Sequence, residues 1–334
     1  MVTVAVVGAG GWGKNLVRNF ATLKNCRLKT VCDLDAAALA RHKVALPEIQ
    51  TTQAIADVLA DAEIEAVIIA TTAPTHFDLA HQALRAGKHV YVEKPMTLGV
   101  ADAEKLVAAA DVAQRVLMVG HLLEYHPCVL KLKEMIASGE LGNVYYMYMH
   151  RLNLGVVRKD ENAWWSLAPH DVSVVTFLFD AEPVTVTSQG QAYLRQGVED
   201  VVFTQLKFAD GRMASIHVSW LDPHRMRKMT LVGTKRMVTF DDAEATEKIR
   251  VYDKSANVTP GSVDYADAIT LRQGDILIPF VSGAEPLKIE CEHFIQCVAE
   301  GRTPRSDGRD GLRVVKVLDA ATRSLRAGGA PVRL

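Results

Sequence analysis

Short apolar runs alternate with amphipathic segments over the first 120 residues of this 334-residue chain. Five apolar runs have the length and composition of strands that are buried on both faces of a parallel sheet: residues 4–7, 28–32, 66–70, 89–92 and 116–119. The helical spacing of apolar positions occurs between them, at residues 35–43, 75–86 and 100–113. Because parallel strands need crossover helices, this alternation predicts an α/β fold with a doubly wound parallel sheet over residues 1–121.

The pattern changes beyond residue 121. We expect a helix over residues 126–138, a strand over 144–151 and a helix whose first position is Pro169. Strand-like runs then follow at residues 184–193, 201–208, 212–220 and 228–232. Asp210-Gly211 is a hairpin turn signal between two of these runs. Residues 122–334 are therefore predicted to form an α/β domain for substrate binding and oligomerisation, built on an open, largely antiparallel sheet.

Two features of the second half predict contacts between subunits. The alternation at residues 215–220 leaves one face of the open sheet partly apolar, which favours a homodimer or homotetramer joined through that face. Residues 257–285 are rich in Gly, Pro, Ser and Asp, and we expect a long loop there that serves as a functional arm or a subunit contact. Helices expected at residues 287–299 and 311–326 complete the chain.

A glycine-rich turn, Gly8-Ala9-Gly10-Gly11-Trp12-Gly13, follows the first apolar run. Glycine lets the backbone turn tightly there and approach a pyrophosphate at the N-terminus of a helix. Asp33 ends the second run, twenty residues later, at the spacing expected for a contact with a ribose hydroxyl. A carboxylate at that position would repel the additional phosphate of NADP. Strand, turn, helix and acidic residue in this order predict a Rossmann domain that binds NAD.

Glu93-Lys94-Pro95 directly follows the run at residues 89–92, so Glu93 and Lys94 are expected at the carboxyl edge of the sheet beside the nicotinamide. The Lys94 ammonium could hold a substrate hydroxyl and stabilise the alkoxide that develops as hydride leaves carbon. A surface lysine in a turn is the alternative.

Thr71, Thr72, Pro74 and His76 follow the run at residues 66–70 and are expected near the cofactor. His76 is equally well explained as a structural residue.

His170 is the candidate general base, because a histidine titrates near neutrality and Pro169 is expected to place it in the first turn of a helix. A polar residue at a helix start is the alternative.

Composition limits the classes of partner. The net charge of −1 argues against a nucleic acid polymer, and no apolar stretch has the length of a membrane span. Since the chain opens in a strand pattern, we expect no signal peptide. The five cysteines lack C-x-x-C spacing and are interpreted as reduced thiols of a cytoplasmic protein. None of the eleven histidines has Cys, Asp or Glu neighbours at ligand spacing, so no metal is predicted.

The glycine-rich turn, Asp33, the Pro74 to His76 segment, Glu93-Lys94-Pro95 and His170 together resemble the glucose–fructose oxidoreductase, inositol dehydrogenase and rhizopine-catabolism (Gfo/Idh/MocA) family. The stretch from Ala86 to Pro95 is the most specific part of a likeness that spans nearly the whole chain. The resemblance implies a Rossmann domain followed by an open-sheet α/β domain, and NAD-dependent oxidation or reduction of a ring carbon. It also implies that Lys94 and His170 are catalytic. Ser166 stands where many members have aspartate, so the role of that carboxylate is not carried over.

Segments at residues 120–127, 151–155 and 165–171 are similar to the family branch that acts on nucleotide sugars and includes UDP-N-acetylglucosamine 3-dehydrogenases. This likeness implies oxidation of the 3-hydroxyl of UDP-N-acetylglucosamine for surface glycans such as lipopolysaccharide. It implies substrate contacts at Glu124, Tyr125, Arg151, Asn153, Asn162, Trp165 and His170. The alternatives are the corresponding uronate, a free sugar or inositol, and a non-enzymatic protein that senses dinucleotides.

Overall fold

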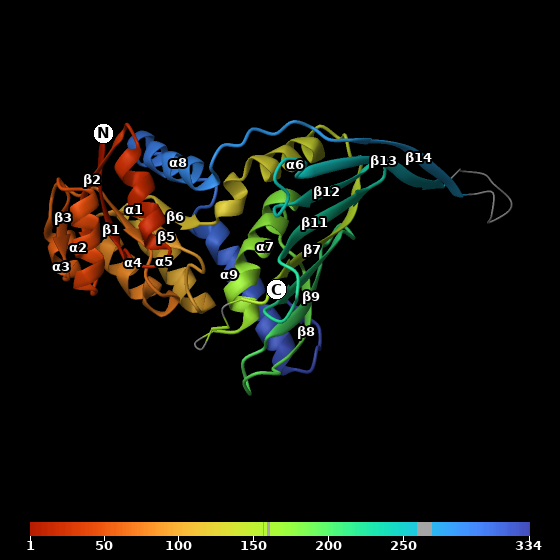
Figure 1. The fold of residues 1–334 in the computed structure, drawn as a ribbon. Helices are drawn as coiled ribbons and strands as arrows, with labels where there is room; N and C mark the ends of the chain where they lie inside the picture. Colours follow the sequence, from red (N-terminus) through yellow and green to blue (C-terminus); the bar gives the residue numbers. More distant parts are fainter. Residues whose placement is uncertain (156, 159–160, 259–268) are drawn as a thin grey trace. The chain divides into compact units, whose positions relative to one another are not determined.

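A computed structural model of the chain describes residues 1–155, 157–158, 161–258 and 269–334 (Figure 1). The chain divides into two compact units. The first contains residues 1–125 and 284–316, and the second contains residues 126–283 and 317–334. The first break falls within four residues of the expected boundary at residue 121, but the return of residues 284–316 to the first unit was not anticipated.

The first unit is built on a six-stranded sheet in the order β3-β2-β1-β4-β5-β6, with every neighbouring pair parallel. Its strands are β1 (Val2–Val7), β2 (Cys26–Cys32), β3 (Gln50–Thr52), β4 (Ala66–Ile69), β5 (His89–Glu93) and β6 (Leu117–Gly120). The helices are α1 (Gly13–Thr22), α2 (Ala36–Ala45), α3 (Ile55–Ala60), α4 (His76–Arg85), α5 (Val100–Ala113) and α8 (Pro286–Glu300). Short 3-10 helices are η1 (Ala73–Thr75) and η2 (Leu122–Tyr125). The strand order reverses between β1 and β4, which is where ligands bind in folds of this kind.

Aromatic packing fixes the C-terminal helix α8 to the core of the first unit. The rings of Phe20 on α1, Tyr91 on β5 and Phe294 on α8 meet edge to face, with centroid separations of 5.7 to 6.3 Å. Their three side chains are fully buried. Edge-to-face pairs contribute about 0.5–1.5 kcal/mol beyond the burial of their area, so α8 belongs to this core although it lies far along the chain.

The second unit contains a nine-stranded sheet in the order β14-β13-β12-β11-β7-β10-β9-β8-β15. Its strands are β7 (Val144–Leu152), β8 (Thr185–Gln191), β9 (Val201–Lys207), β10 (Met213–Ser219), β11 (Met226–Gly233), β12 (Met237–Asp241), β13 (Ile249–Val258), β14 (Ile269–Leu277) and β15 (Val332–Arg333). Among the described strands of this second sheet, only β7 and β10 pair in parallel, so the prediction of an open, largely antiparallel sheet is confirmed. Gly211 has a φ of +88° in the turn between β9 and β10, as the Asp210-Gly211 signal predicted.

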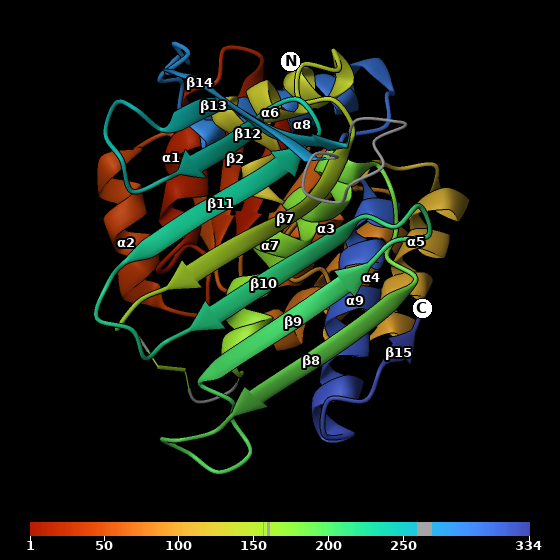
Figure 2. The ribbon, with the colours of Figure 1, turned by 90° about the vertical axis from the view of Figure 1, so that its right-hand side faces the viewer.

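Helices cover one face of this sheet. They are α6 (Pro127–Ala137), α7 (Ala163–Phe179) and the last part of α9 (Gly308–Arg326), which begins in the first unit. Figure 2 looks onto the opposite face, with α7 behind the strands. Tyr146, Tyr148 and Phe203 are exposed on the strands β7 and β9. The expectation that one face of the open sheet is partly apolar is met.

Two predicted elements of the second unit were wrong. Helix α7 begins at Ala163 and contains Pro169, instead of beginning at Pro169. The Asn162 side chain accepts a hydrogen bond from the Trp165 amide at 3.0 Å, and this cap outweighs the preference of proline for a first turn. The loop expected at 257–285 contains the strand β14, whose pairing with β13 depends on tertiary contacts. Residues 259–268 of that loop lie outside the described residues.

No helix in the described ranges combines the length and the apolar composition that crossing a bilayer requires.

Candidate functional site

The glycine-rich turn connects β1 to α1, and two of its glycines are required by sterics. Gly8 has a φ of +88°, and a Cβ atom there would lie 2.7 Å from the Ala70 carbonyl carbon. A Cβ atom on Gly13 would lie 1.8 Å from the Gly8 carbonyl oxygen. Gly10 and Gly11, by contrast, are exposed and face open space. The turn is therefore tight on its inner side and leaves room on its outer side, where the positive end of the α1 dipole favours an anion.

Asp33 lies directly after β2, beside this turn. Its Oδ2 accepts a hydrogen bond from the Ala9 amide at 2.6 Å, and its Oδ1 accepts one from the Asp35 amide at 2.8 Å. The carboxylate is thus fixed by two backbone donors at the carboxyl edge of the sheet. The glycine turn and Asp33 lie together as the sequence predicts, and their arrangement fits the pyrophosphate and ribose of NAD.

Glu93 ends β5 and joins the glycine turn to Lys94. Its Oε1 accepts a hydrogen bond from Trp12 Nε1 at 2.6 Å, and its Oε2 accepts one from the Lys94 amide at 3.2 Å. Burial raises the pKa of Glu93, and the hydrogen bond from Trp12 and the charge of Lys94 offset part of this rise. Because Glu93 is buried, it acts on the backbone that carries Lys94 and not directly on a ligand.

His76 joins the segments that follow β4 and β5. Its Nδ1 lies 2.8 Å from the Pro95 carbonyl oxygen and its Nε2 lies 3.2 Å from the Thr71 carbonyl oxygen. Burial lowers the pKa of His76, against the effect of these two hydrogen bonds, and the Lys94 charge lowers it further. The side chain is only 1% exposed, which favours the structural interpretation of this residue.

Thr71, Thr72 and Pro74 lie between β4 and α4, at the same edge of the sheet. Thr71 Oγ1 and Thr75 Oγ1 are 2.7 Å apart, and the Thr72 carbonyl accepts hydrogen bonds from Thr75. Thr72 and Pro74 are exposed. Thr75 precedes α4, and its side chain does not cap that helix.

His170 lies in the middle of α7 and not in its first turn, which corrects the sequence prediction. The preceding Pro169 has no N–H and therefore cannot donate to the Trp165 carbonyl four residues earlier. The helix hydrogen-bonding ladder is interrupted one residue before the candidate base. His170 is half-buried.

Arg151 and Asp171 form a bidentate ion pair next to His170. Arg151 on β7 donates from Nε to Asp171 Oδ2 at 2.7 Å and from Nη2 to Asp171 Oδ1 at 2.8 Å. Burial lowers the pKa of Arg151, but the charge and hydrogen bonds of Asp171 outweigh burial and leave that pKa raised. The guanidinium predicted to contact substrate is therefore largely neutralised by a residue of its own unit.

Asn162, Trp165 and Asn153, which the sequence places among the substrate contacts, have different surroundings. Asn162 caps α7 and also donates to Glu199 at 2.6 Å. Trp165 is half-buried and donates from Nε1 to Thr322 at 3.0 Å. Asn153 is exposed at the end of β7, so its side chain is accessible to a ligand. Ser166, the position where relatives often have aspartate, is buried in α7.

Glu124 and Tyr125 are almost fully buried, at 1% and 0% exposure, which argues against their predicted contact with substrate. The Tyr125 hydroxyl lies 3.0 Å from Ser306 Oγ. Since η2 packs against α8 in the core of the first unit, both side chains are turned toward protein.

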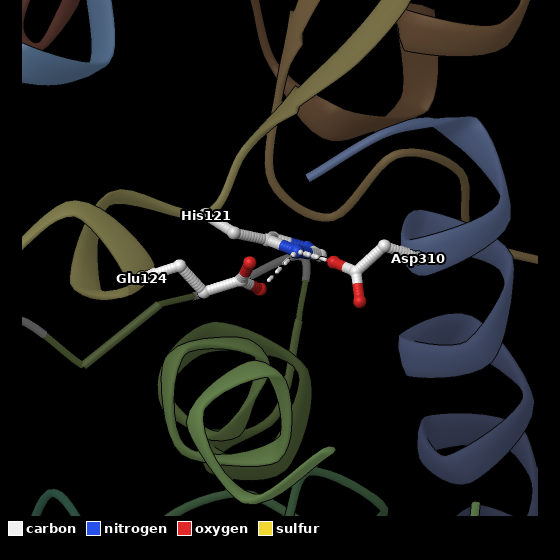
Figure 3. A group of neighbouring side chains, drawn as sticks. All are labelled: His121, Glu124 and Asp310. Carbon is white, nitrogen blue, oxygen red and sulfur yellow. Dashed lines mark hydrogen bonds and ion pairs between the residues drawn. The ribbon is translucent and has the colours of Figure 1, made fainter. Parts of the chain in front are cut away.

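Glu124 belongs to a buried ionic cluster with His121 and Asp310 (Figure 3). His121 Nδ1 lies 2.7 Å from Asp310 Oδ2 and 3.4 Å from Glu124 Oε1. Burial lowers the pKa of His121, but hydrogen bonds to Asp310 and Glu124 outweigh burial and raise it to about 10. Burial is the main reason that the pKa of Glu124 rises to about 8.

The sequence predicted that no histidine has Cys, Asp or Glu neighbours at the spacing of metal ligands, and this cluster shows that the prediction was wrong. His121 and Glu124 share one 3-10 turn, and the fold adds Asp310 from α9, so their ligand atoms lie within 4.8 Å of one another. A protonated His121 already places a positive charge between the two carboxyl groups. An ion-pair network therefore accounts for the arrangement, and the expectation of no metal stays a prediction.

Both parts of the chain match models of one protein family. Residues 2–121 match "Oxidoreductase family, NAD-binding Rossmann fold", and residues 129–239 match "GFO/IDH/MocA C-terminal domain".

Relatives of known activity resemble most of the chain. UDP-N-acetylglucosamine 3-dehydrogenase of Acidithiobacillus ferrooxidans is 29% identical over 76% of each chain. Its solved structure superposes with a TM-score of 0.82, covers 98% of both chains and has 25% identity. Inositol 2-dehydrogenase of Rhizobium meliloti is 27% identical over 97% of each chain. GenD2 from gentamicin A biosynthesis, solved in complex with NAD, superposes with a TM-score of 0.83 and 25% identity, over 100% of this chain and 96% of its own.

Proposed function

The chain belongs to the Gfo/Idh/MocA oxidoreductase family as an NAD-dependent sugar dehydrogenase, and we propose that it oxidises the 3-hydroxyl of UDP-N-acetylglucosamine to the 3-keto sugar. The observation that carries the choice of substrate is the likeness to the 3-dehydrogenase of Acidithiobacillus ferrooxidans, in sequence and in fold. Membership of an oxidoreductase family counts against the non-enzymatic sensor. A free cyclitol is the second candidate, because inositol 2-dehydrogenase of Rhizobium meliloti resembles the chain over more of its length.

The glycine turn and Asp33 are the proposed binding site for NAD. The amides at the start of α1 bind the pyrophosphate, and the Asp33 carboxylate accepts a hydrogen bond from a ribose hydroxyl. When bound, NAD supplies the acceptor for the hydride. Thr71, Thr72 and Pro74 follow β4, the strand next to β1. His76 contacts the Thr71 carbonyl, and Glu93 holds the Trp12 side chain and the Lys94 amide.

Lys94 and His170 are the proposed catalytic residues. The Lys94 ammonium donates a hydrogen bond to the reacting oxygen and stabilises the negative charge that develops there. His170 accepts the hydroxyl proton. Asp171, which follows His170 and pairs with Arg151, anchors this part of α7 to β7.

A neutral sugar is favoured over the uronate by the state of Arg151. This guanidinium is the one on β7 that the family resemblance implies as a substrate contact, and Asp171 engages it through two hydrogen bonds. A second carboxylate at that position would compete with Asp171 for the same donors.

The open sheet face supports the proposed self-association. Tyr146, Tyr148 and His150 follow one another along β7, and His217 on β10 continues this row to Phe203 on β9 through ring separations of 4.1 to 6.5 Å. A continuous row of partly exposed rings on a sheet face is typical of a subunit interface. We propose a homodimer or homotetramer that covers this row.

Deuterated substrate tests the proposed reaction. The purified protein is mixed with NAD and UDP-N-acetylglucosamine that carries deuterium at C3 of the sugar, and the reduced cofactor is analysed by mass spectrometry. We expect the deuterium in the cofactor. Reduced cofactor without deuterium would assign another ring carbon. Parallel reactions use the uronate, myo-inositol and a free aldose, and turnover of one of these without turnover of UDP-N-acetylglucosamine would overturn the proposal.

A further inference from the structure

The strand β14 lies at the edge of the nine-stranded sheet. It pairs with β13 on one side, and no strand in the described part of the chain pairs with its other side. All nine of its residues are exposed, and Leu271, Ile276 and Leu277 are 69%, 53% and 56% exposed. An exposed apolar edge strand is a template for pairing with another strand. The edge of β14 therefore fits an extended partner.

The sequence of this edge is complementary to itself. Residues 269–278 are Ile-Thr-Leu-Arg-Gln-Gly-Asp-Ile-Leu-Ile. If two copies run antiparallel about a two-fold axis between Gln273 and Gly274, Leu271 lies opposite Ile276 and Arg272 lies opposite Asp275. Each contact then occurs twice, as an isologous interface requires.

A bulge in β14 places these opposed residues on matching faces. In a regular strand Leu271 and Ile276 would lie on opposite faces, because they are five positions apart. Tyr252 of β13 pairs with Ile276, however, and Lys254 pairs with Gln273. Two steps along β13 thus match three steps along β14, so Gln273, Ile276 and Leu271 share one face.

Gly274 and Arg272 define the other face of the bulge. A Cβ atom on Gly274 would lie 2.5 Å from Asp253 Oδ2, so a larger residue there would displace the Asp253 side chain. Arg272 donates to the same Asp253 oxygen at 2.7 Å. Asp275 precedes Ile276 and lies on the face opposite to it, which is the face of Arg272.

The charges at this edge are arranged for a second copy. Asp253 orients the Arg272 guanidinium, which remains 55% exposed and has further N–H donors for another carboxylate. In the self-paired arrangement that carboxylate is Asp275 of the second copy.

We propose that β14 pairs antiparallel with β14 of a second copy of this chain, about a two-fold axis between Gln273 and Gly274, so that two nine-stranded sheets join into one. This contact uses the strand edge and is separate from the row of rings on the open face.

Cysteine pairs test the register. Leu271→Cys and Ile276→Cys chains with different tags are co-expressed and oxidised, and crosslinked pairs are counted on a non-reducing gel. The five natural cysteines are buried and do not compete. We expect the mixed-tag crosslink at least tenfold above either variant alone, since opposed positions have the short Cβ separation that a disulfide needs. Leu271→Cys with Leu277→Cys is the control, because these residues lie on opposite faces. Equal crosslinking in the control, or none in the matched pair, would overturn the proposed register.

Charge reversal tests the pairing without oxidation. Arg272→Asp alone and Asp275→Arg alone each place like charges opposite each other twice, and we expect either to weaken the β14 contact about tenfold. Mixing the two variants restores both opposite-charge pairs and should restore assembly measured by analytical ultracentrifugation. Unchanged assembly in both single variants, or failure of the mixture to recover, counts against the proposal.

Discussion

Trp12 Nε1 donates a 2.6 Å hydrogen bond to Glu93 Oε1, and the same carboxylate accepts from the Lys94 amide at 3.2 Å. A residue of the glycine turn thereby fixes the position of the proposed catalytic lysine. We expect Trp12→Phe, which removes the N–H donor and shortens the ring system, to lower kcat/KM about tenfold. A hydrogen bond to a charged acceptor is worth about 1.5–3 kcal/mol, and we take the lower end because Trp12 is partly exposed. Steady-state kinetics with varied NAD check this.

The Trp12→Phe variant has a matched comparison in Trp12→His, which keeps a ring N–H donor. Recovery of part of the activity in Trp12→His points to the hydrogen bond, and equal losses in both variants point to packing alone.

Lys94→Ala and His170→Ala are expected to lower kcat by about 10²–10⁴ while leaving NAD binding close to that of the unmodified chain, because general acid–base groups act on the reacting hydroxyl. Turnover and fluorescence titration with NADH separate the two effects. Lys105→Ala is the control, since Lys105 is an exposed lysine of α5. Undiminished turnover in both variants would show that the catalytic roles are assigned to the wrong residues.

The buried cluster of His121, Glu124 and Asp310 predicts a stability that falls with rising pH. The pKa of His121 is raised from 6.5 to about 10, so its contribution is complete below about pH 6.5 and is lost as pH rises toward 10. The pKa of Glu124 is raised from 4.5 to about 8, so the folded state binds an additional proton between those values and loses stability across them. The contribution of His121 and Glu124 to the free energy of unfolding in urea should therefore decline from about pH 5 to pH 10, whereas histidines with lowered pKa values, such as His76, act in the opposite direction below about pH 6.5.

Glu124→Gln mimics the protonated carboxyl group. The variant therefore isolates the contribution of Glu124 to the pH dependence of the free energy of unfolding. Because Glu93 and Glu290 are also buried with raised pKa values, the informative quantity is the difference between the variant and the unmodified chain. We expect the difference to grow between about pH 4.5 and 8 in favour of the variant. A constant difference over that range would contradict the assigned pKa of Glu124.

The Arg151–Asp171 pair predicts a large cost for losing one partner. Asp171→Asn leaves the Arg151 guanidinium, whose side chain is 12% exposed, without its counter-charge, and we expect the free energy of unfolding to fall by about 3–5 kcal/mol. Urea denaturation measures this change. The double variant Arg151→Met with Asp171→Leu should recover most of the loss, because apolar residues of similar volume replace a buried ion pair at little cost. Additive losses in the double variant would show that the two residues do not act as a pair.

Local chain chemistry was sufficient to predict the parallel half and its glycine turn. The buried pattern of β1, the glycines at Gly8 and Gly13 and the carboxylate at Asp33 each express a short-range constraint of strand, turn or spacing. The same applies to the antiparallel runs β8 to β11 and the turn at Gly211, where alternation and a positive φ leave a signal within a few residues.

Tertiary contacts decided the features that the sequence did not reveal. Asp310 reaches His121 across 189 positions, and Phe294 enters the core around Tyr91, although neither has a local pattern that names its partner. The strand β14 depends on β13 and not on its own composition.

The start of α7 and the surroundings of two predicted substrate residues had different causes. A local cap at Asn162 placed the helix start ahead of Pro169, whereas burial in the tertiary structure turned Glu124 and Tyr125 toward protein. The sequence by itself determined the strands, turns and residue types, because these follow from backbone sterics and side-chain periodicity. Only the tertiary structure decided which polar groups are buried together and which remain accessible, because burial and pairing depend on residues that are distant along the chain.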